Sequence, residues 1–115
     1  GDFMVSVIKM DFNTDDYTRE MLEYLTLTKI LVELRARISR IDRIGDAIAV
    51  LTTTNHVIVY TCDHFFVGMV NEVADILEQV SKICRNEFDK VIQLLQNILP
   101  DEYSKMLDGV LVLLG

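Results

Sequence analysis

The chain has 115 residues, half of them hydrophobic, and a formal net charge of −7. This length predicts a single domain over residues 4–115, with residues 1–3, before Met4, as an expression scar. The acidic balance argues against an autonomous nucleic-acid binder, whose affinity comes from neutralising phosphates. Two cysteines form no disulfide framework, no basic region with a long apolar stretch opens the chain, and no apolar run has the length of a membrane span; these features predict a cytoplasmic protein without a membrane partner.

The first part of the chain predicts a short strand followed by a long helix. Residues 4–10 alternate partly between apolar and polar side chains, as a short strand does. Residues 13–16 read Asn-Thr-Asp-Asp, a typical start of a helix. From there to Gly45 the chain has no glycine or proline, and a helix is predicted from apolar residues that recur every three or four positions: Met21, Tyr24, Leu27, Leu31, Leu34, Ile38, Ile41 and Ile44.

The segment from Ala47 to Cys62 is rich in β-branched residues. It predicts a β-hairpin, with strands over 48–53 and 56–62 and a turn at Thr54-Asn55. The alternative interpretation continues the first helix through Leu51, because Ile44, Ile48 and Leu51 also have helical spacing.

A second long helical stretch is predicted from about Phe65, with Asp63 as its cap and apolar residues at helical spacing as far as Ile98. Capping chemistry predicts a break at Arg85-Asn86, Pro100 ends the next segment, and a short helix follows over 101–107. Residues 110–114 are a helix continuation or a strand. The predicted fold is therefore α+β and mainly α, with two long antiparallel helical stretches joined by a β-hairpin and short C-terminal helices.

One polar cluster, His56, Cys62, Asp63 and His64, contains metal-ligand and nucleophile residue types. On one strand, however, His56 and Cys62 lie about 20 Å apart at ~3.3 Å per residue, too far to share an ion. Cys84 is one of the apolar residues at helical spacing in the second predicted helical stretch, so we expect it to be a small core residue. A metal- or thiol-dependent enzyme around Cys62 and His64 is therefore a minor alternative, and no catalytic, cofactor or metal site is assigned.

Four arginines, Arg35, Arg37, Arg40 and Arg43, form the basic cluster of the sequence. On the predicted helix, their simplest interpretation is a solvated face with local ion pairs. The alternative is a contact with phosphates or an acidic partner, as in an accessory helical subunit of a nucleoprotein complex.

The segment from Arg43 to Val80 resembles the centre of roadblock-type dimerisation domains in its pattern of helix end, β-hairpin and amphipathic helix. This resemblance implies a dimerisation scaffold and covers about a third of the chain.

These observations favour a small intracellular, non-enzymatic interaction or assembly module that forms a homodimer and needs no cofactor. A protein partner is possible, and nucleic acid is expected only within a larger complex. The apolar residues expected to form the interface are Phe66, Val70, Val73, Leu77, Val80, Val110 and Leu111.

Overall fold

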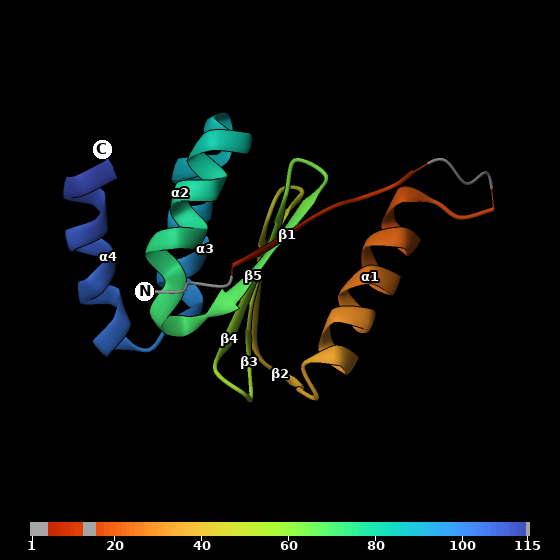
Figure 1. Ribbon diagram of the computed structural model, residues 1–115, viewed down its shortest axis with the longest axis horizontal. Coiled ribbons are helices and arrows are strands. Elements are labelled where there is room, and N and C mark those ends of the chain that lie inside the picture. Colours follow the sequence, from red (N-terminus) through yellow and green to blue (C-terminus); the bar gives the residue numbers. More distant parts are fainter. Residues whose placement is uncertain (1–4, 13–15, 115) are drawn as a thin grey trace.

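The computed structural model describes residues 5–12 and 16–114 of the chain (Figure 1). A first strand and helix precede a run of four strands, and three helices complete the chain. In order the elements are β1 (Ser6–Lys9), α1 (Arg19–Glu33), β2 (Ile38–Ile44), β3 (Ala47–Thr52), β4 (His56–Thr61), β5 (His64–Met69), α2 (Val73–Ile83), α3 (Phe88–Ile98) and α4 (Asp101–Leu114), with 3-10 turns at Val70–Glu72 and Arg85–Glu87.

The five strands form one antiparallel sheet in the order β1-β5-β4-β3-β2. Strands β2 to β5 follow one another through short turns, which is the connection that antiparallel neighbours allow. Helix α1 covers one face of this sheet, while α2 and α3 cover the other and α4 lies outside them (Figure 1). The molecule is therefore a three-layer arrangement with its helices divided unequally between the two faces.

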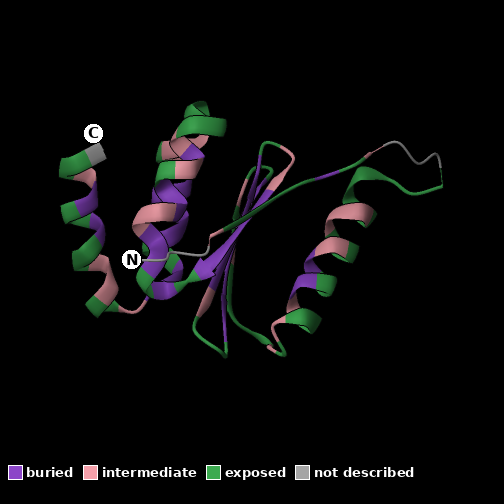
Figure 2. Cartoon of the chain, viewed as in Figure 1, coloured by how far each residue is buried: buried purple, intermediate pink, exposed green. Residues whose placement is uncertain are grey.

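The sheet separates two hydrophobic cores. Alternate residues of β3 belong to different cores: Ala47, Ala49 and Leu51 pack toward α2 and α3, whereas Ile48 and Val50 pack toward α1. Every residue of β3 is buried, which explains its nearly continuous apolar sequence (Figure 2).

The predicted fold class is wrong, because a five-stranded sheet stands where two long helical stretches were expected. Residues 38–44, assigned to the end of the first helix, form β2, and α1 ends at Glu33. Residues 64–69, assigned to the start of the second helical stretch, form β5. Both segments have apolar residues three or four apart, but each pairs with a neighbouring strand, and the tertiary pairing overrides the local pattern.

Several local predictions are confirmed. Strand β1 lies within residues 4–10, and the predicted hairpin is β3–β4, which excludes a helix through Leu51. The break at Arg85-Asn86 is a 3-10 turn between α2 and α3, and residues 110–114 continue α4.

Two predictions concern segments that the structure does not fully describe. The helix start at 13–16 falls largely outside the described residues, and α1 begins at Arg19, where the Thr18 side chain accepts a hydrogen bond from the Met21 N–H. The prediction about residues 1–3 lies wholly outside them.

Candidate functional site

The residues predicted to form an interface lie in the core between the sheet, α2, α3 and α4. Six of them are buried, and Leu111 is half-buried and packs against the same core. The side chains concerned are Phe66, Val70, Val73, Leu77, Val80, Val110 and Leu111. The chain's own sheet and helices therefore cover the apolar stripe, and any surface for a partner has to be sought elsewhere.

The four arginines do not share a helix face. Arg35 and Arg37 lie in the connection after α1, and Arg40 and Arg43 are on β2. Arg40 is opposite Leu51 and Arg43 is opposite Ile48, and these two neighbours belong to different cores. Because cross-strand partners lie on the same face of a sheet, Arg40 and Arg43 extend on opposite faces. The prediction of one Arg-bearing helix face is therefore wrong.

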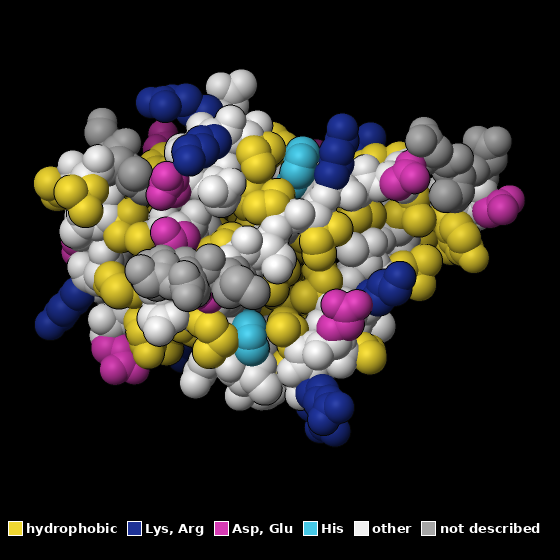
Figure 3. Space-filling view, viewed as in Figure 1, with side chains coloured by type: hydrophobic (Ala, Val, Ile, Leu, Met, Phe, Trp, Pro, Cys, Tyr) yellow, Lys and Arg dark blue, Asp and Glu magenta, His cyan; other side chains and the backbone are white. Residues whose placement is uncertain are grey.

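The outer surface of α1 is unusually apolar. Only Leu27 and Ile30 of this helix are buried, against the sheet. Leu22 and Leu31 are half-buried against the same core, and four further large apolar side chains are exposed, with relative accessibilities of 47% for Met21, 58% for Tyr24, 53% for Leu25 and 70% for Val32. Figure 3 shows hydrophobic side chains among scattered charges over this end of the molecule. Large exposed apolar patches on soluble proteins are often interaction sites, so this helix is a candidate interaction surface.

Strand β2 exposes two further apolar side chains at the edge of the sheet. Ile38 and Ile41 are exposed, and their partners across the strand pair, Thr52 and Val50, place both of them on the α1 side. A shallow hollow joins the helix to the strand there, with Tyr24 and Ile41 among its lining residues. We call this surface, made of Tyr24, Ile38 and Ile41, the α1–β2 surface. Met21, Leu25 and Val32 lie on the outer side of α1, away from the buried Leu27 and Ile30.

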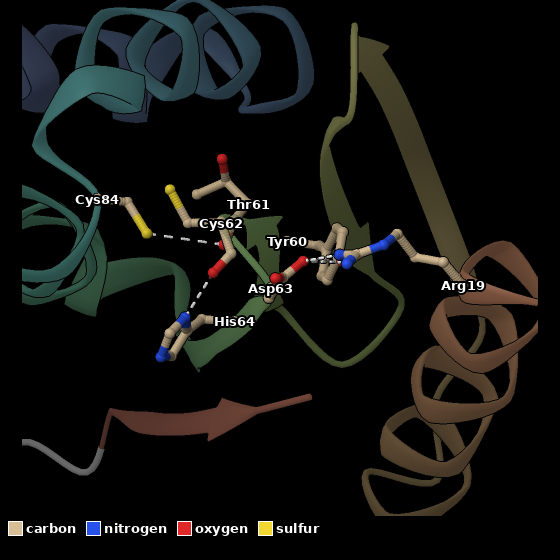
Figure 4. Close-up of polar contacts among 7 residues, drawn as sticks. All are labelled: Arg19, Tyr60, Thr61, Cys62, Asp63, His64 and Cys84. Atoms are coloured by element: carbon tan, nitrogen blue, oxygen red, sulfur yellow. Dashed lines mark hydrogen bonds and ion pairs between the residues drawn. The ribbon is translucent and has the colours of Figure 1, made fainter. Parts of the chain in front are cut away.

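The turn between β4 and β5 has an unusual backbone. Its two central residues, Cys62 and Asp63, have φ angles of 49° and 60°, in the left-handed region that glycine or asparagine usually occupies in such hairpins. Asp63 forms an ion pair with Arg19 at the start of α1, and the Tyr60 hydroxyl lies 3.5 Å from the Asp63 carboxylate (Figure 4). This turn therefore ties the sheet to the start of α1, and left-handed non-glycine residues are frequent at functional sites.

A cavity of about 210 Å³ adjoins this turn. Its wall carries more carboxylates than cations, and its lining residues are Arg19, Glu23, Asp46, Tyr60, Thr61, Cys62, Asp63 and Glu87. Burial, followed by the neighbouring Glu23 carboxylate, raises the pKa of Tyr60 well above its usual value. Its phenol is therefore a neutral hydrogen-bond donor and not a base at ordinary pH.

The two cysteines meet beside this turn. Cys84, at the end of α2, is buried, and its thiol lies 3.8 Å from the carbonyl oxygen of Thr61. Burial raises the pKa of the Cys84 thiol to about 12, and a hydrogen bond with the Cys62 side chain adds to this effect. Figure 4 shows the sulfur atoms of Cys62 and Cys84 on the same side of the turn, toward each other. Both are free thiols, and Cys62 is exposed.

The two histidines do not join the thiols. His64 Nδ1 lies 2.6 Å from the Cys62 carbonyl oxygen, and because a carbonyl only accepts, this nitrogen donates the proton. His56 is at the other end of β4, where its Nδ1 lies 2.8 Å from the Thr54 hydroxyl. Among residues 5–12 and 16–114, no three His, Cys, Asp or Glu side chains are grouped so as to hold a metal ion.

Comparisons with known proteins identify no relative. No family model matches the chain, and neither the curated proteins nor the solved structures contain a match. The segment that resembles a roadblock-type centre contains three full strands and part of a fourth instead of one hairpin. In the part of the chain that the structure describes, no helix combines the length and apolar character that a membrane crossing requires.

Sequence reasoning missed the α1–β2 surface and the proximity of the two thiols. The first had a visible signal, because the apolar stripe of residues 21–32 is wider than one sheet contact needs. The second had none, since Cys62 and Cys84 are separated by β5 and α2 and come together only through the packing of α2 against the sheet.

Proposed function

We propose that this protein is a non-enzymatic assembly module that forms a homodimer by pairing the β2 strands of two copies. The single observation that carries this proposal is that β2 is an exposed edge strand whose sequence is complementary to itself. The α1–β2 surface supplies the apolar part of the same contact.

The two edges of the sheet differ in their suitability for pairing. Strand β1 has four residues and ends in Lys9, and short edges with lysine are typical of edges that resist association. Strand β2 has seven residues, and within residues 5–12 and 16–114 no strand pairs with its backbone on the side away from β3. An edge of this length can add a strand from another chain through main-chain hydrogen bonds.

A two-fold axis through Ile41 gives an antiparallel pair with matched charges. In that register Ile41 faces Ile41 of the second copy, and Arg40 faces Asp42 of the second copy. The symmetry repeats the Arg40–Asp42 contact, so that each interface has two opposite-charge pairs. Arg40 and Asp42 both lie on the face of α2 and α3, because their partners on β3 are Leu51 and Ala49. The two charges can therefore meet across the interface.

Asp42 is already held in place for this contact. Its Oδ2 accepts a hydrogen bond of 2.7 Å from the Asn97 side chain on α3, and its Oδ1 accepts one of 2.9 Å from the Arg43 N–H. A carboxylate has lone pairs for about four such contacts, so an arginine can still bind. The fixed side chain loses little entropy when it pairs.

The other face of the same strand supplies apolar contact. Ile41 lies beside Tyr24 at the hollow between α1 and β2, and both are more than half exposed. In a two-fold pair, the Ile41 side chains of the two copies adjoin, with the two Tyr24 rings beside them. Aromatic and aliphatic side chains at the centre of an interface are the usual anchors of binding energy.

The placement of Arg40 and Arg43 on opposite faces of the sheet favours this function over an accessory nucleoprotein subunit, because these two side chains cannot share one phosphate-binding face. The test is a charge-reversal cycle followed by sedimentation velocity over a range of protein concentrations. The variants are Arg40→Asp, Asp42→Arg and the double change, with Lys9→Asp as the matched control. Lys9 carries the same charge as Arg40 and is exposed, but it lies on β1 at the opposite edge of the sheet.

We expect the wild-type chain to dimerise, each single variant to weaken dimerisation at least tenfold because like charges then face each other, and the double variant to recover it. Lys9→Asp changes the net charge as much as Arg40→Asp does and should leave the dimer nearly intact. A wild-type chain that stays monomeric at high micromolar concentration overturns the proposal. A double variant no better than the single ones overturns the register.

A further inference from the structure

We propose that Cys62 and Cys84 form a dithiol site that peroxides oxidise to an intramolecular disulfide. The site is a modification site separate from the α1–β2 surface, and it does not depend on dimerisation. It uses one exposed thiol at a turn and one buried thiol at the end of a helix.

The backbone holds the two thiols together. The Cys84 thiol contacts the carbonyl oxygen of Thr61, and that oxygen belongs to the planar peptide group that ends at the Cα atom of Cys62. The left-handed conformation of Cys62 and Asp63 then turns the Cys62 side chain to the side on which Cys84 lies (Figure 4). Both ends are fixed, because the Arg19 ion pair holds Asp63 and the core packing of α2 holds Cys84.

The two thiols differ in accessibility, and this difference assigns their roles. Cys62 is exposed and Cys84 is 3% exposed, so a dissolved oxidant reaches Cys62. The raised pKa of the Cys84 thiol keeps it protonated, so it reacts only after its neighbour has been activated. Cys62 is thus the attacking thiol and Cys84 the resolving one.

The reaction balances with one peroxide molecule. The Cys62 sulfur attacks a peroxide oxygen, an S–O bond forms, the O–O bond breaks, and the leaving oxygen departs as an alcohol or water with the thiol proton. The Cys84 sulfur then attacks the Cys62 sulfenic acid, an S–S bond forms, the S–O bond breaks, and hydroxide leaves with the Cys84 proton as water. The two thiols lose two electrons, and the O–O bond takes them up.

The experiment treats the reduced full chain with hydrogen peroxide and follows it by intact mass, thiol alkylation and peptide mapping. We expect a product with the mass of a single chain less two hydrogens, which resists alkylation at both cysteines and yields a peptide joined through Cys62 and Cys84. A product with Cys62 oxidised to sulfinic acid while Cys84 stays free overturns the proposal. So does a disulfide between the Cys62 residues of two chains, or no oxidation at all.

Two variants test the roles. Cys84→Ser should stop the reaction at the Cys62 sulfenic acid, which dimedone traps, and Cys62→Ser should leave Cys84 unreacted under the same conditions. Rapid oxidation of Cys84 in Cys62→Ser overturns the assigned order. Because Cys84 is buried, its variant is first compared with the wild type by circular dichroism. If that variant is unfolded, the mapping of the wild-type disulfide still decides the proposal.

Discussion

The two faces of the sheet are covered to very different depths. On one face, α2 and α3 bury nearly their whole apolar surface, and α4 covers them in turn. On the other, α1 and the segment after β1 cover the sheet, and α1 fully buries only Leu27 and Ile30, with Leu22 and Leu31 partly buried. Four of its large apolar side chains remain exposed (Figure 2). The first face has the packing of a complete core, and the second keeps apolar area exposed, as the proposed interface requires.

If the proposed dimer forms, one face of the sheet supplies mainly folding stability and the other face supplies apolar area for binding. Hydrophobic burial is the main source of folding free energy, so the α2–α3 face should supply most of it. The α1 face contributes less to the isolated chain and keeps apolar area available for binding. Substitutions in the core between the sheet, α2 and α3 should therefore change the free energy of unfolding. Substitutions of exposed residues on the α1 side should instead change association.

The largest effect should come from truncating a core leucine of α2. Leu77 is fully buried, and Leu77→Ala should lower the free energy of unfolding by about 3 kcal/mol, from lost transfer energy and the cavity that remains. Val32→Ala, on the outer side of α1, should change it by less than about 0.5 kcal/mol. Urea unfolding of both variants in an Arg40→Asp background removes any contribution from association. Equal losses in the two variants would contradict the division between the faces.

The same two faces explain how much of the fold the sequence could predict. The β3–β4 hairpin was predictable, because β-branched composition is a local signal. The break at Arg85-Asn86 was also placed correctly, although no side-chain hydrogen bond caps the 3-10 turn or α3 there. Strand β2 was not. Ile38, Ile41 and Ile44 are three residues apart, as on a helix, but a bulge between Ile38 and Arg40 shifts the alternation of the strand. Ile38 and Ile41 therefore share a face, although a regular strand would separate them.

Strand β5 was predicted as helix for a related reason. Phe66, Val70 and Val73 have helical spacing, although Phe66 lies in the strand and the other two follow it. The overlooked signal was Gly68. A Cβ atom at this position would lie 3.3 Å from side-chain atoms of Ile76 and Val5, so α2 and the segment before β1 pack closely on the strand there. The candidate site was less predictable still, because the approach of Cys84 to Cys62 depends on long-range packing that no local pattern encodes.

A smaller loss of folding stability should appear at alkaline pH, and one titrating side chain in each core causes it. Cys84 lies in the core beneath α2 and Tyr60 in the core beneath α1, and burial raises the pKa of both. Each group is neutral when protonated, so above about pH 9 for the thiol and pH 10 for the phenol the unfolded chain loses the proton first. The folded state is then destabilised as pH rises, by at most about 1.4 kcal/mol per pH unit for each group.

Urea unfolding between pH 8 and pH 11 measures this loss, and two variants assign it. Cys84→Ala should flatten the first part of the decline, and Tyr60→Phe should flatten the part above pH 10. Below pH 8 both groups are protonated in both states, so the variants should show no change in slope there. A decline that keeps its full steepness in the double variant would mean that other groups cause it.

The smallest effect concerns amide hydrogen exchange in α1, which shows whether this helix opens by itself or only together with the rest of the fold. The Thr18 side chain caps this helix by accepting a hydrogen bond of 3.2 Å from the Met21 N–H, and removal of such a cap costs about 1 kcal/mol. Because α1 has few buried contacts, Thr18→Ala should speed amide hydrogen exchange within residues 19–33 and leave α2 and α3 protected. Thr18→Ser keeps the hydroxyl and should restore the slow exchange. If α2, α3 and α4 lost protection to the same extent as α1, then α1 would open only when the whole fold opens. In that case α1 could not adjust its apolar surface to a partner without unfolding the rest of the chain.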